Sequence, residues 1–357
     1  MRILFLAIIL WHSVILSAQE KITLLFVGDL MQHDAQIKAA RTPQGYDYSD
    51  CFKHLKEAIS QADLAIGNLE VTLAGKPYRG YPSFSAPDEY LQAIKEAGFD
   101  ILLTANNHCL DRRKKGLERT ILLLDSLGIS HAGTYRTPEE RAEHYPLLVE
   151  VKGLRIAFLN YTYDTNGLEP STPNVVNYIH KEEIRQDILK ARRMHPDVII
   201  ACMHWGLEYH LRPNKAEREL ADWLLAQGVD HIIGSHPHVP QPIEVKKSAH
   251  SHHKHAVVYS LGNFISNMSK LHTDGGVMVK LEFKKFPHYS YLNDCNYSLV
   301  WTSRPQLSGK KNFEIYPASF ISQPISNEEF IPMNTYLKDI RQLYERYNIG
   351  VSEYIFE

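Results

Sequence analysis

The sequence predicts a layered α/β fold in which helices cover sheets, and two observations carry this prediction. The first is a regular alternation of short apolar runs with amphipathic stretches from Lys21 to about Phe283. The second is that five apolar runs stop at a polar residue, as buried strands do. Because ligands of open α/β sheets collect at the carboxyl ends of strands, these five ends form the expected functional edge.

The first part of this alternation predicts three strands and three helices. The strands are expected at Ile22–Val27, Leu64–Ile66 and Ile101–Thr104, and the helices at Cys51–Gln61, Glu89–Ala97 and Gly116–Leu127. Gly98 and Gly128 follow two of the helices, where a left-handed glycine commonly ends a helix.

The second part begins with a tight hairpin at Lys152-Gly153-Leu154, between strands at Leu147–Val151 and Arg155–Leu159. Further strands are expected at Val198–Cys202, His231–Ile233 and Val257–Leu261, and helices at Lys181–Met194 and Lys215–Ala226. These elements complete the alternating region.

After Phe283 the amino-acid composition changes, and Tyr, Asn, Ser and Pro become common. Short strands are expected at Ser298–Thr302 and Phe313–Tyr316, and an amphipathic helix at Glu328–Tyr347. We interpret residues 19–283 as the main domain and residues 284–357 as a C-terminal extension packed on its core.

The first 18 residues resemble a secretory signal, with Arg2, an apolar stretch and the small residues Ser17 and Ala18. The alternative is a membrane anchor, but His12 and Ser13 interrupt a stretch shorter than the roughly 20 apolar residues of a span. We therefore expect an exported protein, periplasmic or at the cell surface, that contacts a membrane only if this segment is uncleaved.

The overall charge excludes some classes of partner. A net charge of -2 gives no sign of a nucleic-acid binder.

The four cysteines are far apart and form no CxxC pair, so disulfide connectivity stays open and buried thiols are the simpler interpretation.

The polar residues at the strand ends are the donors that a metal-dependent hydrolase uses. They are Asp29, Glu70, Asn107, His204, His236 and His238. Two ions about 3.5–4 Å apart need an anion between them, and Glu70 is well placed to bridge. We expect two divalent ions (Mn, Fe or Zn), with His108 near the substrate as a general acid or electrostatic clamp.

Neighbouring residues have two interpretations each. Asp111 could orient the His108 imidazole or cap the helix that starts near Lys114. Glu208 could contact substrate or form a salt bridge with Arg212. Asn263 could face the site or occupy a turn beside Gly262.

Two clusters of polar residues lie beside these motifs. The run Arg112, Arg113, Lys114 and Lys115 follows His108 and is a candidate cradle for a phosphate or polyanion, although such runs are usually solvated helix starts. The segment SAHSHHKHA is better interpreted as a solvated loop than as a zinc-binding tract.

Six ordered motifs carry a specific resemblance: GDLM, GNLE, ANNHCLD, HWGLEY, GSHPHVPQ and YSLGNF. From Ile22 to Phe264 the chain resembles the CapA family of bacterial poly-γ-glutamate capsule synthesis proteins, within the calcineurin-like metallophosphoesterase superfamily. The resemblance implies a four-layer αββα sandwich with a binuclear metal site.

Carried over residue by residue, the resemblance makes Asp29 the opening aspartate and Glu70 the replacement for a bridging aspartate. Asn107 and His108 match the superfamily's Asn-His pair, His204 its lone histidine, and His236 and His238 its closing pair. One position departs, because Met31 stands where the superfamily has a metal-binding His, and His33 is the candidate to compensate. Glu70 is also one methylene longer than the residue it replaces.

The motifs and the resemblance together lead to one expectation with two alternatives. We expect an exported metal-dependent hydrolase-like protein of capsule or cell-surface polymer biosynthesis. Its partners would be an anionic cell-surface polymer or a phosphoester substrate, and capsule assembly proteins. The alternatives are a non-catalytic polymer-binding component of capsule assembly or export, and a generic phosphodiesterase or phosphatase.

Overall fold

The computed structural model describes residues 20–247, 254–322 and 325–355. The predicted signal at residues 1–18 and three histidines of the SAHSHHKHA segment (His250, His252 and His253) lie outside the described residues. Within the described ranges, no helix combines the length and the apolar character needed to cross a membrane.

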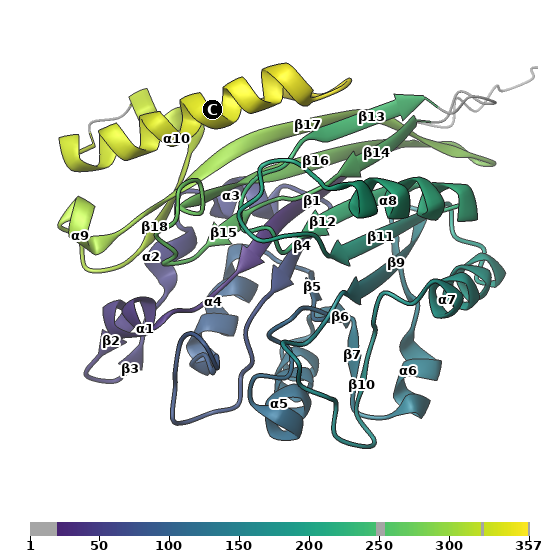
Figure 1. Ribbon diagram of the computed structural model, residues 1–357, viewed down its shortest axis with the longest axis horizontal. Helices are drawn as coiled ribbons and strands as arrows, with labels where there is room; N and C mark the ends of the chain where they lie inside the picture. Colours follow the sequence, from purple (N-terminus) through teal and green to yellow (C-terminus); the bar gives the residue numbers. More distant parts are fainter. Residues whose placement is uncertain (1–19, 248–253, 323–324, 356–357) are drawn as a thin grey trace, which may run out of the picture.

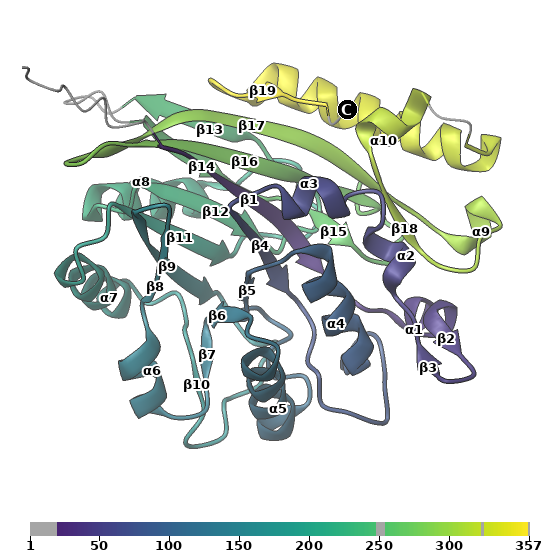
Figure 2. The same cartoon turned by 180° about the vertical axis from the view of Figure 1, so that it is seen from behind.

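Two large sheets form the centre of the fold (Figures 1 and 2). The first has the strand order β18-β17-β16-β1-β4-β5-β6, with β15 beside β1 and β19 beside β17. Its strands are β1 (Glu20–Leu30), β4 (Leu64–Leu69), β5 (Ile101–Leu103), β6 (Ser130–Ala132), β15 (Asn263–Ile265), β16 (Gly275–Lys285), β17 (Ser290–Ser303), β18 (Glu314–Pro317) and β19 (Ser352–Glu353).

The second sheet has the order β13-β14-β12-β11-β9-β8. Its strands are β8 (Leu147–Val151), β9 (Leu154–Thr162), β11 (Val198–His204), β12 (His231–Ser235), β13 (Ile243–Lys247) and β14 (Lys254–Val258). Two small ribbons pair β2 (Arg41–Thr42) with β3 (Gly45–Tyr46), and β7 (Thr134–Tyr135) with β10 (Val175–Val176).

Helices cover the outer face of each sheet. Figure 2 shows α3 and α4 in front of the first sheet, and Figure 1 shows α8 in front of the second. The helices are α1 (Asp34–Ala40), α2 (Ser49–Phe52), α3 (Lys56–Ser60), α4 (Asp88–Ala97), α5 (Arg113–Ser126), α6 (Pro138–His144), α7 (Lys181–Arg193), α8 (Lys215–Gln227), α9 (Pro305–Ser308), α10 (Asn327–Tyr347) and the 3-10 helix η1 (Ala318–Ser322).

Alternating side chains along β1 explain the four layers, because successive residues of a strand point to opposite faces. Leu24 and Phe26 join a core between the two sheets that also contains Phe158 of β9. Leu25 and Val27 join a second core under α4. A third core lies between the second sheet and helices α7 and α8. These cores confirm the expected α/β fold and its four-layer αββα arrangement.

Several local predictions are confirmed. The hairpin turns at Lys152 and Gly153, both in the left-handed region, between β8 and β9. Gly98 ends α4 with φ 108 and donates its N–H to the carbonyls of Ile94 and Lys95. The four described cysteines are free and buried.

Several predicted boundaries are wrong. The short strand expected at Ser298–Thr302 is part of the 14-residue strand β17 (Ser290–Ser303). The single helix expected at Cys51–Gln61 is two short helices, α2 and α3, which are interrupted before Leu55 (φ -118). The side chains of Lys53 and His54, between the two helices, contact Glu314 of β18. The strand expected at Val257–Leu261 begins earlier and stops at Val258 in β14, because the chain turns through Gly262 (φ 67) before β15.

The residues after Phe283 contact both sheets. β17 pairs with β16 along its length, and α10 places Tyr336, Leu337 and Ile340 in the core between the sheets. Beyond α10, the Val245 N–H of β13 donates to the Ile349 carbonyl at 2.7 Å, and β19 pairs with β17. The last described segment therefore joins the two sheets.

The lowered pKa of Glu314 predicts that the protein loses stability in acid. Glu314 is 2% exposed. Burial favours its neutral form, but hydrogen bonds from Lys53, His54 and Lys310 outweigh burial and lower the pKa of Glu314 to about 2. A depressed folded pKa stabilises the protein above the unfolded pKa of 4.5, and this stabilisation is lost as pH falls toward 2.

Glu314→Gln is therefore expected to lower the free energy of unfolding at pH 7 by on the order of 2–3 kcal/mol. Urea unfolding of both proteins between pH 2 and pH 7 measures this, and the difference should shrink toward pH 2. Glu345→Gln on the exposed face of α10 is the control, with no pH-dependent difference expected. A difference for Glu314→Gln that stays constant with pH would contradict the assignment.

Candidate metal centre

The first sheet supplies three of the predicted donors at the ends of neighbouring strands. Asp29 lies near the end of β1, and Glu70 and Asn107 follow β4 and β5. Close backbone contact fixes Asp29: a Cβ at Gly28 would meet the Gly262 oxygen at 1.8 Å, and the Asp29 N–H donates to that oxygen at 3.0 Å. Only glycine at position 28 allows this approach.

The second sheet supplies the three histidines. His204 ends β11, and His236 and His238 follow β12. His204 Nε2 lies 2.9 Å from Asn107 Oδ1 and 3.8 Å from Glu70 Oε1. His238 Nε2 lies 3.7 Å from the same Glu70 oxygen. The structure therefore brings the six predicted donors together, with Glu70 between two imidazoles.

The possible ligands fall into two groups. Asp29, Glu70 and His204 form one, and Glu208, His236 and His238 form the other; within each group the ligand atoms lie within 4.8 Å of one another. Glu208 was expected to contact substrate or Arg212. Arg212 instead contacts the ring and hydroxyl of Tyr347.

Burial sets the charge states of these groups. Burial, followed by the neighbouring Asp29 charge, raises the pKa of Glu70. Burial lowers the pKa of His204, with smaller effects of His236 and His238, and burial and His238 lower the pKa of His236 to about 3. Neutral imidazoles are the form that binds metal.

The donor set fits a divalent metal pair. Glu70 Oε1 and His236 Nδ1 are buried and have no hydrogen-bond partner. Buried polar atoms without partners are costly, and a metal ion satisfies both a carboxylate oxygen and an imidazole nitrogen. Two buried carboxylates beside three imidazoles are the mixed oxygen and nitrogen ligands of Zn, Mn or Fe sites.

Two asparagines hold the ligands in place. Asn68 donates to Asp29 Oδ1 at 2.8 Å and to Glu70 Oε2 at 3.3 Å. Sequence reasoning missed it, although it lies in β4 only two residues before Glu70. Asn263 is fully buried, and its Oδ1 lies 3.0 Å from His238 Nδ1. With Asp29 Oδ2 also 3.0 Å from that nitrogen, His238 keeps Nε2 toward Glu70.

The departure at Met31 leaves a donor missing. Met31 packs in the core under the first sheet. His33 belongs to neither described metal-binding group. Its Nδ1 accepts from the Asn267 N–H at 3.2 Å and lies 3.2 Å from Gln36 Oε1. His33 is thus held by neighbouring polar groups.

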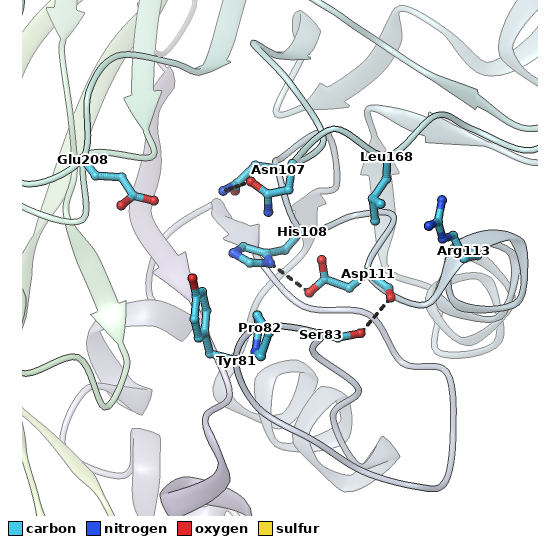
Figure 3. Close-up of a pocket in the computed structure, with 10 residues that line it drawn as sticks. Tyr81, Pro82, Ser83, Asn107, His108, Asp111, Arg113, Leu168 and Glu208 are labelled. Carbon is cyan, nitrogen blue, oxygen red and sulfur yellow. Dashed lines mark hydrogen bonds and ion pairs between the residues drawn. The ribbon is translucent and has the colours of Figure 1, made fainter.

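A cavity of about 600 Å³ lies beside the donors (Figure 3). It is lined by Tyr81, Pro82, Ser83, Asn107, His108, Asp111, Arg113, Asn166, Leu168 and Glu208. Figure 3 shows His108 between Asp111 on one side and the Glu208 carboxylate across the cavity. Sequence reasoning missed the Tyr81–Ser83 loop and Asn166, because loop positions carry no strand-end pattern.

Asp111 orients His108. Its Oδ2 lies 2.8 Å from His108 Nδ1 and accepts from the Phe84 N–H at 2.8 Å. The alternative interpretation, a helix cap, is wrong, because the N-cap of α5 is Arg112, which has no side-chain cap bond. Phe84 also packs its ring edge against His108, with centroids 4.6 Å apart.

The basic run contributes one residue to the cavity. Arg113 lines it. Arg112 is the N-cap of α5, and Lys114 and Lys115 are exposed in its first turn. Lys114 pairs with Glu118 at 3.9 Å, as a solvated helix face does.

Comparison with protein families gives one match that spans most of the chain. The model described as bacterial capsule synthesis protein PGA_cap matches residues 23–268. A capsule biosynthesis protein CapA of Bacillus anthracis is 28% identical over 278 residues, which is 74% of this chain and 64% of that relative. A PGA biosynthesis protein CapA of Bacillus subtilis is 28% identical over 73% of this chain and 67% of that relative. The chain spans about two thirds of the length of these curated relatives.

Solved structures include a similar chain described as the calcineurin-like phosphoesterase YfkN from Bacillus subtilis. It superposes with a TM-score of 0.45 and 14% identity, covering 91% of this chain and 97% of that chain.

Proposed function

The chain belongs to the bacterial capsule synthesis protein PGA_cap family, and on that premise we propose that it is a metal-dependent hydrolase of capsule or cell-surface polymer biosynthesis. Its substrate would be poly-γ-glutamate, of which it would hydrolyse an amide bond, or a phosphoester of another cell-surface polymer. The observation that carries the proposal is the buried Glu70 oxygen that faces two imidazoles beside a cavity containing a paired His108 and Asp111.

Each residue of the site has a role in this proposal. Asp29, Glu70, Asn107, His204, His236 and His238 would hold two divalent ions (Mn, Fe or Zn). Bound ions would polarise the scissile group and lower the pKa of water. His108 would donate a proton to the leaving group from Nε2, because Asp111 occupies its Nδ1.

Export is part of the proposal and rests on the sequence of residues 1–18. We place the protein in the periplasm or at the cell surface, where capsule assembly proteins would be its partners. N-terminal sequencing of the mature protein tests this location, and a retained Met1 in a membrane fraction would contradict cleavage.

The experiment for the main proposal is a substrate screen with the purified protein. Poly-γ-glutamate, phosphomonoesters and phosphodiesters are incubated with Mn²⁺, Zn²⁺ or a chelator. Metal-dependent shortening of the polymer supports the proposal, and turnover of small phosphoesters alone would indicate a generic phosphodiesterase or phosphatase. No turnover with any metal would leave the second candidate below.

The second candidate is a non-catalytic component that binds an anionic polymer for assembly or export. Two observations favour it: Met31 removes an expected metal ligand, and Arg113 lines the cavity. The metals and Arg113 would then create a local positive potential on a protein whose net charge is only -2.

Arg113→Ala is expected to weaken poly-γ-glutamate binding about two- to fivefold, the range of one exposed ion pair. Lys115→Ala is the matched control, because Lys115 is exposed on the same helix and does not line the cavity. Calorimetric titrations at low and high salt measure both, and wild-type binding should weaken as salt rises. Equal effects of the two substitutions on binding would show that Arg113 does not contact the polymer.

A further inference from the structure

Glu208 lies in the loop after β11. Backbone hydrogen bonds join this loop to the loop after β12, which contains His236 and His238. The Trp205 N–H, directly after β11, donates to the Ser235 carbonyl at 3.1 Å. The Tyr209 N–H donates to the carbonyl of Pro237, between the two histidines, at 2.8 Å. Glu208 stands between these two bonds, so its position relative to His236 and His238 is fixed by the backbone.

The backbone itself is strained at this junction. His236 (φ 100), His238 (φ 59) and Tyr209 (φ 67) all adopt the left-handed region. Such conformations cost about 1–3 kcal/mol each and gather at ligand-binding sites. Here they turn the Glu208 carboxylate and both imidazoles toward one another.

The three side chains together have the geometry of a metal site. Their ligand atoms lie within 4.8 Å of one another, and His236 Nδ1 is buried without a hydrogen-bond partner. Two ligands at about 2.1 Å from an ion are at most about 4.2 Å apart, so shifts of less than about 1 Å let the three share one ion.

We propose that Glu208 is a metal ligand, together with His236 and His238, and replaces the donor lost at Met31. This inference rests on the proposed metal dependence and goes further by assigning the compensating ligand. Figure 3 shows the Glu208 carboxylate directed into the cavity from the side opposite Arg113. Glu208 thus closes the metal centre toward the substrate.

The charges of the site are consistent with a third carboxylate. Asp29 and Glu70 belong to one group and Glu208 to the other. Each ion then has a carboxylate of its own group, and Glu70 lies 3.7 Å from His238 of the second group. Divalent cations such as Mn²⁺ bind a set that includes a carboxylate oxygen better than imidazoles alone.

The test is calorimetric titration of the mature protein with Mn²⁺, supported by metal content after dialysis. Wild type should bind two ions, and Glu208→Gln should weaken one of them by at least about tenfold while leaving the other unchanged. His33→Ala examines the rival compensating residue, and Glu219→Gln on exposed α8 is the matched control. Both should bind two ions as wild type does.

The outcomes separate this inference from the proposed function. Circular dichroism and thermal unfolding show that each variant is folded, and Glu208→Asp provides a second, shorter carboxylate that should recover part of the affinity. If Glu208→Gln binds two ions with unchanged affinity, or if His33→Ala loses as much affinity as Glu208→Gln, the assignment of Glu208 as a ligand is overturned. The proposed metal dependence would still stand. A wild-type protein that binds no ion would overturn the proposed metal dependence as well.

Discussion

Replacing Glu70 by glutamine is expected to remove metal binding without unfolding the protein. Glu70 is fully buried, and its Oε1 faces His204 and His238. Glutamine keeps the volume but loses the charge that two cations require. In wild type, Mn²⁺ at about 100 times its dissociation constant should add about 2.7 kcal/mol of stability for each bound ion. In the variant this increase should be absent.

In chelator, the same substitution should not lower the melting temperature of the protein. Burial and Asp29 raise the pKa of Glu70, which shows that its charged form is unfavourable without a cation. Glu70→Gln should therefore melt no lower than wild type in chelator. Glu329→Gln is the control, since Glu329 is also buried but bonds Ser303 and Tyr316. Its Mn²⁺-dependent stabilisation should equal that of wild type.

Thermal unfolding with and without Mn²⁺ measures both effects. A Glu70→Gln protein that is still stabilised by Mn²⁺ as strongly as wild type would exclude Glu70 as a ligand. A Glu70→Gln protein that is unfolded in chelator would show instead that Glu70 is needed for folding.

Replacing His108 by alanine should slow hydrolysis by about 100- to 10,000-fold, the usual contribution of a positioned general acid. The effect should fall on kcat, because proton donation occurs in the transition state and not in substrate binding. His108 belongs to neither metal-binding group, so metal content should stay at the wild-type level. The measurement is steady-state kinetics on the substrate that the screen identifies.

Asp111→Asn tests how His108 is positioned. Asp111 holds His108 Nδ1 and the Phe84 N–H. An asparagine keeps one acceptor but loses the charge, so kcat should fall less than in His108→Ala. An unchanged kcat in His108→Ala would contradict proton donation by this residue.

The sequence predicted which side chains of the first and second sheets lie together at the candidate metal centre, because each stands at or just after the end of a buried strand. Asp29, His204 and His236 each follow an apolar run, and parallel neighbours bring such ends together. The pairing of His108 with Asp111 was one of two open interpretations, since a spacing of three residues suits both an orienting carboxylate and a helix cap.

Other features could not be predicted because they depend on contacts between distant segments. Glu208 joins His236 only because two loops are bonded through Tyr209 and Pro237. Lys53 and His54, where the helix expected at Cys51–Gln61 is interrupted, contact Glu314 more than 250 residues later. Apolar periodicity contains no information about either contact.

The donors of the metal centre come from both sheets, and this has a consequence for the motions of the protein. Asp29 and Glu70 belong to the first sheet, and His204 and His236 to the second. Local opening that separates the sheets must break the ligand set, so bound ions should slow amide hydrogen exchange in β1 and β11 together. By thermodynamic reciprocity, anything that loosens the contact between the sheets weakens ion binding by the same free energy. The candidate metal centre and the core between the two sheets would then open and close as one cooperative unit.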